Sequence, residues 1–585
     1  MTVVLPKDRR YLIGFRFPEL IPFEMNTVDL SLVLVAFFRR AILEGKGITG
    51  GSQAALAANA DIATSVDAFV TSTSRLEGFD SPRGRRAASR LVRGALTILV
   101  RENRSKELQI RGLSPFTLAS IRPAFPAVSS GDTRRVDHFL CSVLLKRIDK
   151  RAEQAYDTKE LHSYITREFG QGVCVQGHPS FDVRRMEGEL PDLDILSELS
   201  LTLAEALHPI SSRHDTGRYI AANPLAMFQA RFGAHLRRYW SAFSDRSPMP
   251  LVIDQSIALI GFELTIMTIR LLHAVPTLIK DYEAATSTFD LSLESTCPQV
   301  YVDWVGDPRH LSWELARATA RRDLGQLQPF AQAVLRLRYL NTQISSIKGE
   351  AEYRKIVAEA LGSDQELDTS RYVVGLLTLA NHSAISGELR VAARNDCKFI
   401  LEENQISNSD SQDEDGPVTE SEADRLYRDI AEAGGAPSDQ VLALIHRASG
   451  AQTQKNIQGW LAGVGGIGTS HGLIHGGVNR NTWAYAPGNE LLSVLVQLCA
   501  VDHDMKGGEP IPFGVAEFLE WLEDRFGVIV DRPPAGLGFD GPEHAAAARD
   551  NLQAMLRRLR LMGMFEDQTD DFTVQEITPP FATRV

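Results

Sequence analysis

The stretch Thr27–Glu44, TVDLSLVLVAFFRRAILE, decides the fold class of this 585-residue chain. Its apolar residues recur at the 3.6-residue spacing of a helix, namely at Leu30, Leu34, Phe37, Phe38 and Ala41. Asn26 or Thr27 can cap this helix, and Gly45 ends it. The most apolar part, Val28–Ile42, contains two arginines and is shorter than the about 20 residues that cross a bilayer, so we predict no membrane segment.

The same periodicity predicts helices along most of the chain. They cover Arg85–Glu102, Thr133–Tyr156, Leu193–Leu207, Leu225–Phe243, Gln255–Ala274, Leu311–Arg322, Leu327–Ile344, Glu350–Leu361 and Asp439–Ala448. Short alternating apolar patterns within 288–305, on both sides of Cys297–Pro298, indicate one hairpin or a small sheet. We therefore expect a mainly α protein whose multi-helix body, residues 1–403, contains a small β element.

A change of composition follows this body. Residues 404–421, NQISNSDSQDEDGPVTES, contain almost no apolar side chains and carry a cluster of acidic ones. Such a segment cannot bury enough apolar surface to offset the entropy of ordering it, so we predict a disordered acidic linker. Residues 422–480 follow, and they are predicted to contain helices and a glycine-rich loop.

Charge is distributed unevenly along the chain. The whole sequence has 62 Lys and Arg against 74 Asp and Glu, a net charge of −12, and its 44% hydrophobic content excludes a collagen-like or wholly disordered chain. Residues 83–151 hold 16 Lys and Arg against five acids, so this segment carries +11 and the remainder −23. One basic helical region is thus suited to a polyanion.

Regularly spaced basic residues define the candidate nucleic-acid contacts in that segment. Arg86, Arg90 and Arg93 repeat on one face of the first predicted basic helix, and Arg134, Arg135, Lys146 and Lys150 belong to the second. Arginines in such a row neutralise phosphates and release counterions. The alternative is that they face solvent or form salt bridges within the protein or with another subunit.

The five cysteines are widely separated and form no CxxC pair. Their odd number and spacing favour reduced thiols over a disulfide framework or a structural zinc site. The N-terminal residues also lack the apolar core of a secretory signal. These features predict a cytoplasmic protein.

Three patterns are candidates for catalytic chemistry. Gly463, Gly465 and Gly468 in GVGGIG match the dinucleotide pattern GxGxxG, but no convincing strand precedes them and no helix can follow, so a turn cluster is favoured. His471 and His475, four residues apart, join Asp502, His503 and Asp504 as candidate metal ligands. The glycines between the two histidines argue against the helix that such a site needs, which favours polar loop residues.

The third pattern is the HD dipeptide, found at His214–Asp215 and again at His503–Asp504. Helical metal-dependent phosphohydrolases use such a pair, but they also require a separate histidine and aspartate on helices. His214 lies in the loop-like run ISSRHDTG. The sequence contains no P-loop, no GxSxG elbow and no strand-borne nuclease pattern, so we predict no cofactor and no metal site, and no catalytic residue can be assigned from the sequence.

The last hundred residues, 481–585, have the element order of a winged helix. Helices are predicted over Asn489–Ala500, Val515–Phe526 and Pro542–Met562, followed by a hairpin whose second strand is Phe572–Ile577. The third helix carries four candidate phosphate contacts, Arg549, Arg557, Arg558 and Arg560. Winged helices bind DNA or dock proteins, so both alternatives remain open for this α+β domain.

Three runs in this region carry a family resemblance. They are NTWAYAPGNELLSVLVQLC from Asn481, FLEWLEDRFGVIVDRPP from Phe518 and RDNLQAMLRRLRLMGMFEDQTDDFTVQ, which ends at Gln575. The region resembles uncharacterised components of bacterial anti-phage defence clusters of the methylation-associated type. The resemblance implies a setting in a phage-defence complex with a DNA methyltransferase and nuclease or ATPase subunits, and it supplies no active-site residue.

The favoured function is therefore a non-enzymatic, structural or nucleic-acid-associated subunit of an anti-phage defence complex. Other defence-system proteins and duplex DNA are its expected partners. One alternative is a metal-dependent nuclease or phosphohydrolase that uses His471, His475, Asp502, His503 or Asp504. The other is a stand-alone DNA-binding regulator, which the overall acidity disfavours.

Overall fold

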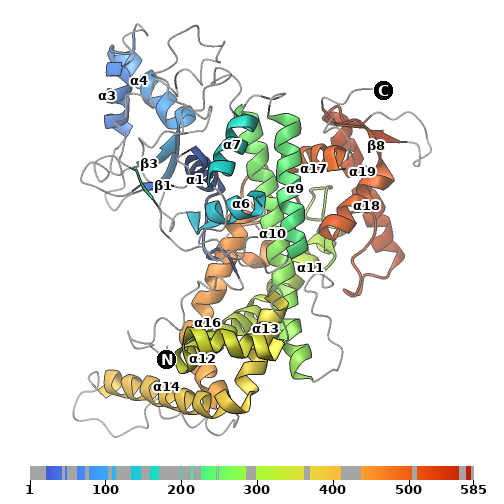
Figure 1. Cartoon of the computed structure of the whole chain (residues 1–585). Coiled ribbons are helices and arrows are strands. Elements are labelled where there is room, and N and C mark those ends of the chain that lie inside the picture. The colour runs from blue at the N-terminus through green and yellow to red at the C-terminus, as the bar shows by residue number, and fades with distance from the viewer. Residues whose placement is uncertain are drawn as a thin grey trace, which may run out of the picture.

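Helices dominate the described chain, and one of the longest, α10 (Met249–Glu283), runs through its centre (Figure 1). The computed structural model describes residues 21–42, 46–48, 62–72, 78–102, 108–113, 133–145, 158–169, 199, 212–214, 226–244, 247, 249–284, 298–361, 369–409, 437–477, 479–502, 510–565 and 575–580. The predicted mainly α class is confirmed.

Helix α10, Met249–Glu283, is the central core helix, and α9, Ala226–Phe243, lies beside it (Figure 1). Leu264, Met267 and Leu271 on α10 are fully buried. By length and composition α10 could cross a membrane, but 94% of its most apolar window is buried inside the protein. A helix that is apolar all round needs such a surrounding shell, and neighbouring helices supply it here.

The N-terminal helix α1, Leu30–Ile42, packs against α6, Val136–Leu145, and α7, Thr158–Phe169. It begins where Asp29 Oδ1 accepts the N–H of Ser31 at 2.9 Å, so Asp29 provides the cap rather than Asn26 or Thr27. Aromatic rings join these helices to α9, because the Phe38 centroid lies 5.1 Å from Phe169 and 6.4 Å from Trp240. Residues 146–156 of the predicted second basic helix lie outside the described residues.

A smaller group of elements lies beside α1. It contains α3, Ile62–Ser72, α4, Pro82–Leu91, the π-helical turn η2, Val92–Leu96, and the hairpin of β2, Thr97–Glu102, with β3, Leu108–Leu113. The helix predicted over Arg85–Glu102 is therefore wrong beyond Leu96. Gly94 weakens the helix, and the run TILV that follows has high β propensity, which overrides the apolar spacing of the helix.

Four helices form a lower lobe, yellow and orange in Figure 1. They are α12, Leu327–Leu361, α13, Thr369–Asn381, α14, Ser383–Ser409, and α16, Pro437–Val464. α12 spans both helices predicted between Leu327 and Leu361. The lobe has its own hydrophobic cluster, formed by Leu335, Tyr339, Ala393, Cys397, Ile400, Val441, Leu444 and Ile445. α14 extends into the predicted linker as far as Ser409, and residues 410–421 lie outside the described part of the chain.

The C-terminal region contains α17, Asn489–Asp502, α18, Val515–Phe526, and α19, Pro542–Leu561. Strand β8, Phe513–Gly514, pairs antiparallel with β10, Glu576–Ile577, and Phe565 bridges to Ile577. The order along the chain is thus α17, β8, α18, the strand β9 (Val528–Ile529), α19, Phe565 and β10. These helices share one hydrophobic cluster with α1, α9 and α10, so the predicted boundary at residue 481 does not interrupt the core.

A second strand pair connects this region to the body. β5, Val300–Tyr301, pairs in parallel with β9, Val528–Ile529. The hairpin or small sheet predicted over 288–305 stays a prediction for its first strand, and the structure adds β9 as a partner of the second, a pairing of distant segments that local alternation cannot reveal. Residues 285–297 lie outside the described residues.

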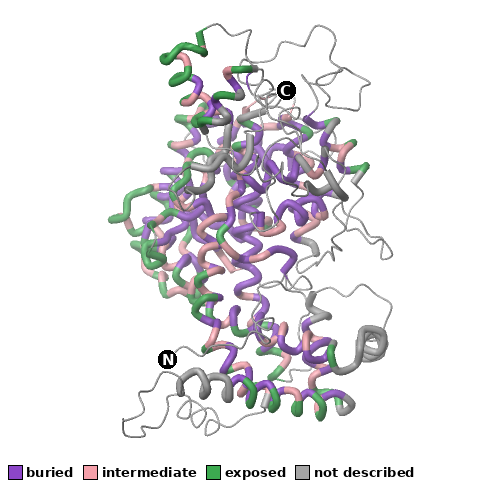
Figure 2. The backbone as a smooth tube through the Cα atoms, turned by 90° about the vertical axis from the view of Figure 1, so that its left-hand side faces the viewer, coloured by how far each residue is buried: buried purple, intermediate pink, exposed green. Residues whose placement is uncertain are grey.

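The remaining elements are short or connect larger ones. They are β1, Lys46–Ile48, paired with β4, Ser212–His214; β6, Ile474–His475, paired with β7, Ala484–Tyr485; η5, Arg480–Thr482; and α11, Leu311–Gly325. Of the predicted helix at 193–207, only Leu199 is described. Figure 2 shows buried backbone running through the middle of the molecule and into the lower lobe.

Candidate nucleic-acid interface

Four arginines form one row on α4 and its π-helical continuation. Arg83, Arg86, Arg90 and Arg93, here called the arginine row, recur at helical spacing and are all exposed. The burial pattern explains this orientation, because Ala88, Val92 and Leu96 are fully buried on the other side of the same elements. The row spans about 15 Å at 1.5 Å per residue.

Local contacts set the start of α4 and separate Arg85 from the row. Ser81 Oγ accepts the N–H of Gly84 at 3.0 Å, and Pro82 occupies the first turn. The Nη1 atom of Arg85 lies 2.5 Å from Asp67 Oδ1 on α3. Among the described residues, no acid forms an ion pair with the arginine row, so its charge is available to an outside anion.

The second predicted basic helix does not extend this row. Arg134 and Arg135 have φ angles of 52° and 63°, in the left-handed region, and precede α6 instead of lying on it. Arg134 Nε donates to the carbonyl of Thr27 at 3.1 Å, and its Nη1 lies 3.7 Å from Glu24. Arg134 therefore ties α6 to the segment before α1, and its nucleic-acid contact stays a prediction. Lys146 and Lys150 lie outside the described residues.

The arginines of α19 divide into two groups. Arg549, Arg557 and Arg560 are exposed, whereas Arg558 points into the protein. Its Nη1 donates to the carbonyl of Pro487 at 3.2 Å, and its guanidinium lies 5.7 Å from the ring centroid of Trp304. Burial lowers the pKa of Arg558. These contacts fasten α19 to the body, and the phosphate contact expected of Arg558 stays a prediction.

A buried amide, which sequence reasoning missed, fixes the same helix. Asn551 Nδ2 donates to the carbonyls of Val302 at 2.8 Å and Val530 at 3.0 Å. Its Oδ1 accepts the N–H of Trp304 at 2.5 Å. Asn551 is fully buried, so these bonds satisfy backbone groups beside the β5–β9 pair. A polar residue on the apolar side of a predicted helix was the only signal for this contact.

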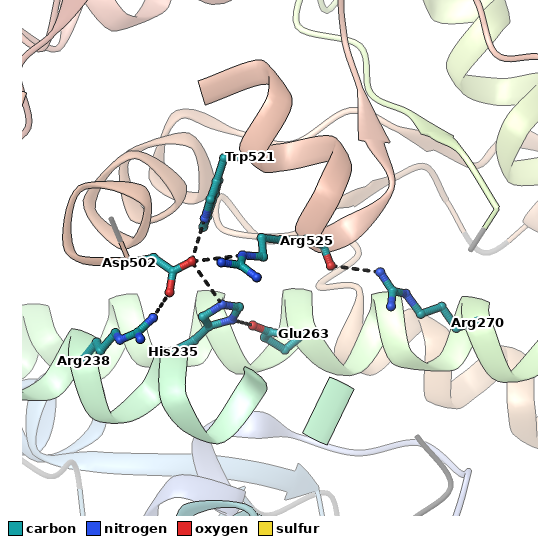
Figure 3. A network of polar contacts seen from close by, with 7 residues as sticks. All are labelled: His235, Arg238, Glu263, Arg270, Asp502, Trp521 and Arg525. Carbon is teal, nitrogen blue, oxygen red and sulfur yellow. Dashed lines mark hydrogen bonds and ion pairs between the residues drawn. The ribbon is translucent and has the colours of Figure 1, made fainter. Parts of the chain in front are cut away.

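A network of buried charges lies where α17 and α18 meet α9 and α10 (Figure 3). Asp502 is at its centre: Oδ1 accepts from Arg238, and Oδ2 accepts from Trp521 Nε1 at 2.9 Å and Arg525 Nε at 3.1 Å. His235 extends the network. Its Nε2 lies 3.9 Å from Asp502 Oδ2, and its Nδ1 lies 2.5 Å from Glu263 Oε1.

The partners of Asp502 hold it in the ionised state. Burial raises the pKa of this carboxyl, but the Trp521 hydrogen bond and the charges of His235, Arg525 and Arg238 together bring it below the usual value. Arg270 adds a further connection from α10, since its Nη2 donates to the carbonyl of Arg525 at 2.9 Å. The network thus joins four helices by charge-assisted hydrogen bonds, which suits a structural clamp.

The structure does not bring the candidate metal ligands together. His471 Nδ1 lies 4.0 Å from Glu490, and the ring of His475 packs 5.2 Å from that of Trp313. Asp502 is instead engaged by the buried network. His503 and Asp504 lie outside the described residues. Within the described ranges, no group of three His, Cys, Asp or Glu side chains is arranged to hold a metal ion.

The glycine pattern caps the end of α16. The N–H of Gly465 donates to Leu461 O at 2.8 Å, and the N–H of Ile467 donates to Ala462 O at 3.1 Å. Gly466 has a φ of 66°, which the tight turn requires and which other residues rarely adopt. GVGGIG is therefore a turn cluster, as the sequence favours. Of the upstream HD pair, His214 lies in β4, and Asp215 is outside the described residues.

Comparison with protein families gives one match. The family described as methylation-associated defense system protein MAD7 matches residues 10–581. This match confirms the resemblance found in Asn481–Gln575 and extends it over nearly the whole chain. No curated protein and no solved structure matches.

Proposed function

Because this chain belongs to the methylation-associated defense system protein MAD7 family, and is thus an anti-phage defence-system component, we propose that it is a non-enzymatic subunit that attaches its defence complex to duplex DNA. Other proteins of the defence system are its proposed partners. The observation that carries the DNA contact is the arginine row of α4.

The geometry of the arginine row fits the phosphate backbone of DNA better than it fits a single acidic side chain of a protein. Four exposed guanidinium groups occupy about 15 Å of helix, and B-DNA presents one negative charge per about 1.7 Å of its axis. α4 itself carries no acidic residue, and Asp67, the acid that pairs with it among the described residues, contacts Arg85 outside the row. Contacts of this kind are independent of base sequence.

The C-terminal elements support a second part of the proposal, a winged-helix arrangement over residues 489–577. Apart from β9, which pairs with β5, the order of α17, β8, α18, α19, Phe565 and β10 is that of three helices with a small sheet, and β10 lies between β8 and Phe565 in the pairing. In such domains the last helix faces DNA or a protein. The exposed Arg549 and Arg557 favour DNA here.

A cytoplasmic location completes the proposal. The described cysteines Cys141, Cys397 and Cys499 are free thiols and are all buried. Burial raises the pKa of Cys499 and of Cys397, which keeps both thiols protonated and unreactive. Such cysteines suit a reducing compartment.

The test is the salt dependence of binding between the full chain and labelled duplex DNA, measured by fluorescence anisotropy. Replacing Arg83, Arg86, Arg90 and Arg93 by Ala should weaken binding to unrelated sequences alike. It should also reduce the slope of log K against log salt by about 3–4, since each phosphate contact contributes about 0.9.

The control is the double variant Arg390→Ala and Arg394→Ala, which removes two exposed arginines from α14 in the lower lobe. It should leave the slope unchanged. An unchanged slope in the α4 variant would remove the arginine row from the interface. Absence of any DNA binding by the wild-type chain at low salt would overturn the proposed function.

A further inference from the structure

The exposed side of α19 differs chemically from the arginine row. Arg549, Gln553 and Arg557 are four residues apart, lie on one face and are all exposed. Asp550, with 66% of its side chain exposed, lies next to them, and its Oδ2 is 3.5 Å from His310 Nε2. This surface thus combines hydrogen-bond donors and acceptors, whereas the side chains of the arginine row are hydrogen-bond donors alone.

The opposite side of α19 is rigidly held. Asn551 makes three hydrogen bonds to the backbone around β5 and β9, and Arg558 is bound to Pro487. Met555 and Leu559 are fully buried in the core. The exposed side chains therefore project from a helix whose position is fixed, which lowers the entropy lost when they bind.

The major groove of duplex DNA is the partner that this mixture fits. The groove is wide enough for a helix, and α19 is about 30 Å long at 1.5 Å per residue. Arginine bonds to guanine and glutamine to adenine, each through two hydrogen bonds, while a carboxylate accepts from cytosine. A phosphate surface would repel Asp550, so base edges suit this face better than the DNA backbone does.

We propose that α19 reads base edges in the major groove through Arg549, Gln553 and Arg557, and so gives the chain a sequence preference that the arginine row lacks. This inference rests on the proposed function, because it assumes that the partner is duplex DNA. In this arrangement α4 supplies sequence-independent affinity, and α19 selects the site.

The experiment is selection of bound duplexes from a randomised pool, followed by affinity measurements on the enriched sequence. The wild-type chain should enrich a short motif. Gln553→Ala should reduce the base preference at one position of the motif by roughly 5- to 150-fold. Its affinity for unrelated DNA should stay unchanged. Gln553→Glu, which only accepts hydrogen bonds at neutral pH, should shift that position toward cytosine.

Two controls separate this proposal from the one on which it rests. The α4 row variant should bind all sequences more weakly but enrich the same motif, and Arg394→Ala should behave as wild type. Gln553 is exposed, so heat denaturation should show unchanged stability for its variants. Binding without an enriched motif, or an unchanged motif in both Gln553 variants, would overturn base reading by α19 and leave DNA association intact. Loss of all binding in the wild type would instead reject the proposed function.

Discussion

Helices α4 and α19 both carry arginines at helical spacing, yet the protein uses them differently. All four members of the α4 row are exposed, whereas on α19 Arg558 is bound to Pro487 and packs against Trp304. The difference follows from the neighbours, since α4 lies at the side of the molecule and α19 packs on α11 and α17 (Figure 1). Helical spacing of arginines therefore predicts an exposed basic surface only where no other element packs against that face of the helix.

The largest effect should come from the clamp that holds the C-terminal helices. Asp502→Ala leaves Arg238, Arg525 and the buried Trp521 Nε1 without their acceptor. Breaking a buried ion pair on one side costs about 3–5 kcal/mol, and because Arg238 and Arg525 are each 37% exposed, the free energy of unfolding should fall by the lower end of that range, about 3 kcal/mol, in urea denaturation. Asp67→Ala, which removes the exposed partner of Arg85 on α3, should cost less than about 1 kcal/mol. Equal losses in the two variants would show that the clamp is no stronger than a surface pair.

A direct comparison of neighbouring residues on α19 comes next in size. Arg558→Ala removes the hydrogen bond to Pro487 and the contact with Trp304, and should lower the free energy of unfolding by about 1–3 kcal/mol. Arg557→Ala changes an exposed side chain and should stay within about 0.5 kcal/mol. DNA affinity should respond in the opposite order, with Arg557→Ala the weaker binder at pH 7. If Arg558→Ala weakens DNA binding without loss of stability, the assignment of the two arginines is reversed.

Local pattern predicted the fold where helices bury one continuous apolar face. The predicted Leu225–Phe243 became α9, Ala226–Phe243, because no competing signal interrupts it. Prediction failed where distant segments meet, as in the pairing of β5 with β9, and where β propensity overrode helical spacing in Thr97–Glu102. A helical repeat of apolar residues encodes neither the distant partner of a strand nor the β propensity of individual residues.

The candidate site was predictable in part for the same reason. Arg86, Arg90 and Arg93 were identified because their spacing and exposure depend on one helix alone. Asn551 and the His235–Asp502 network were missed, since residues 235 and 502 come together only through the packing of α9 against α17. Sequence reasoning thus identified exposed charge and missed the buried polar contacts that decide which charge stays exposed.

The smallest expected effect is the loss of folding stability at acidic pH. It distinguishes the buried ion pairs of Asp502 and Asp137 from the exposed ion pair between α3 and α4. The folded pKa values of Asp502 and Asp137 lie below the usual aspartate value; burial raises both, but neighbouring cations and hydrogen bonds outweigh it. Asp137, for example, accepts from Thr133 at 2.7 Å and from Arg40 at 3.0 Å. A lowered folded pKa contributes stability above the unfolded value, about 3.9, and that contribution is lost as the pH falls through the folded pKa.

Urea denaturation at a series of pH values between about 7 and 2.5 measures this contribution. The wild-type free energy of unfolding should decrease as the pH drops below about 4. Asp502→Asn should be less stable at pH 7 but should decrease less steeply, because it has one fewer carboxylate to protonate, and adding Asp137→Asn should flatten the curve further. Asp67→Asn should instead follow the wild-type curve, since its partner Arg85 is exposed and the pair is screened by solvent. If the Asp502 and Asp67 variants show the same acid slope, buried ion pairs do not distinguish the C-terminal helices from α3 and α4.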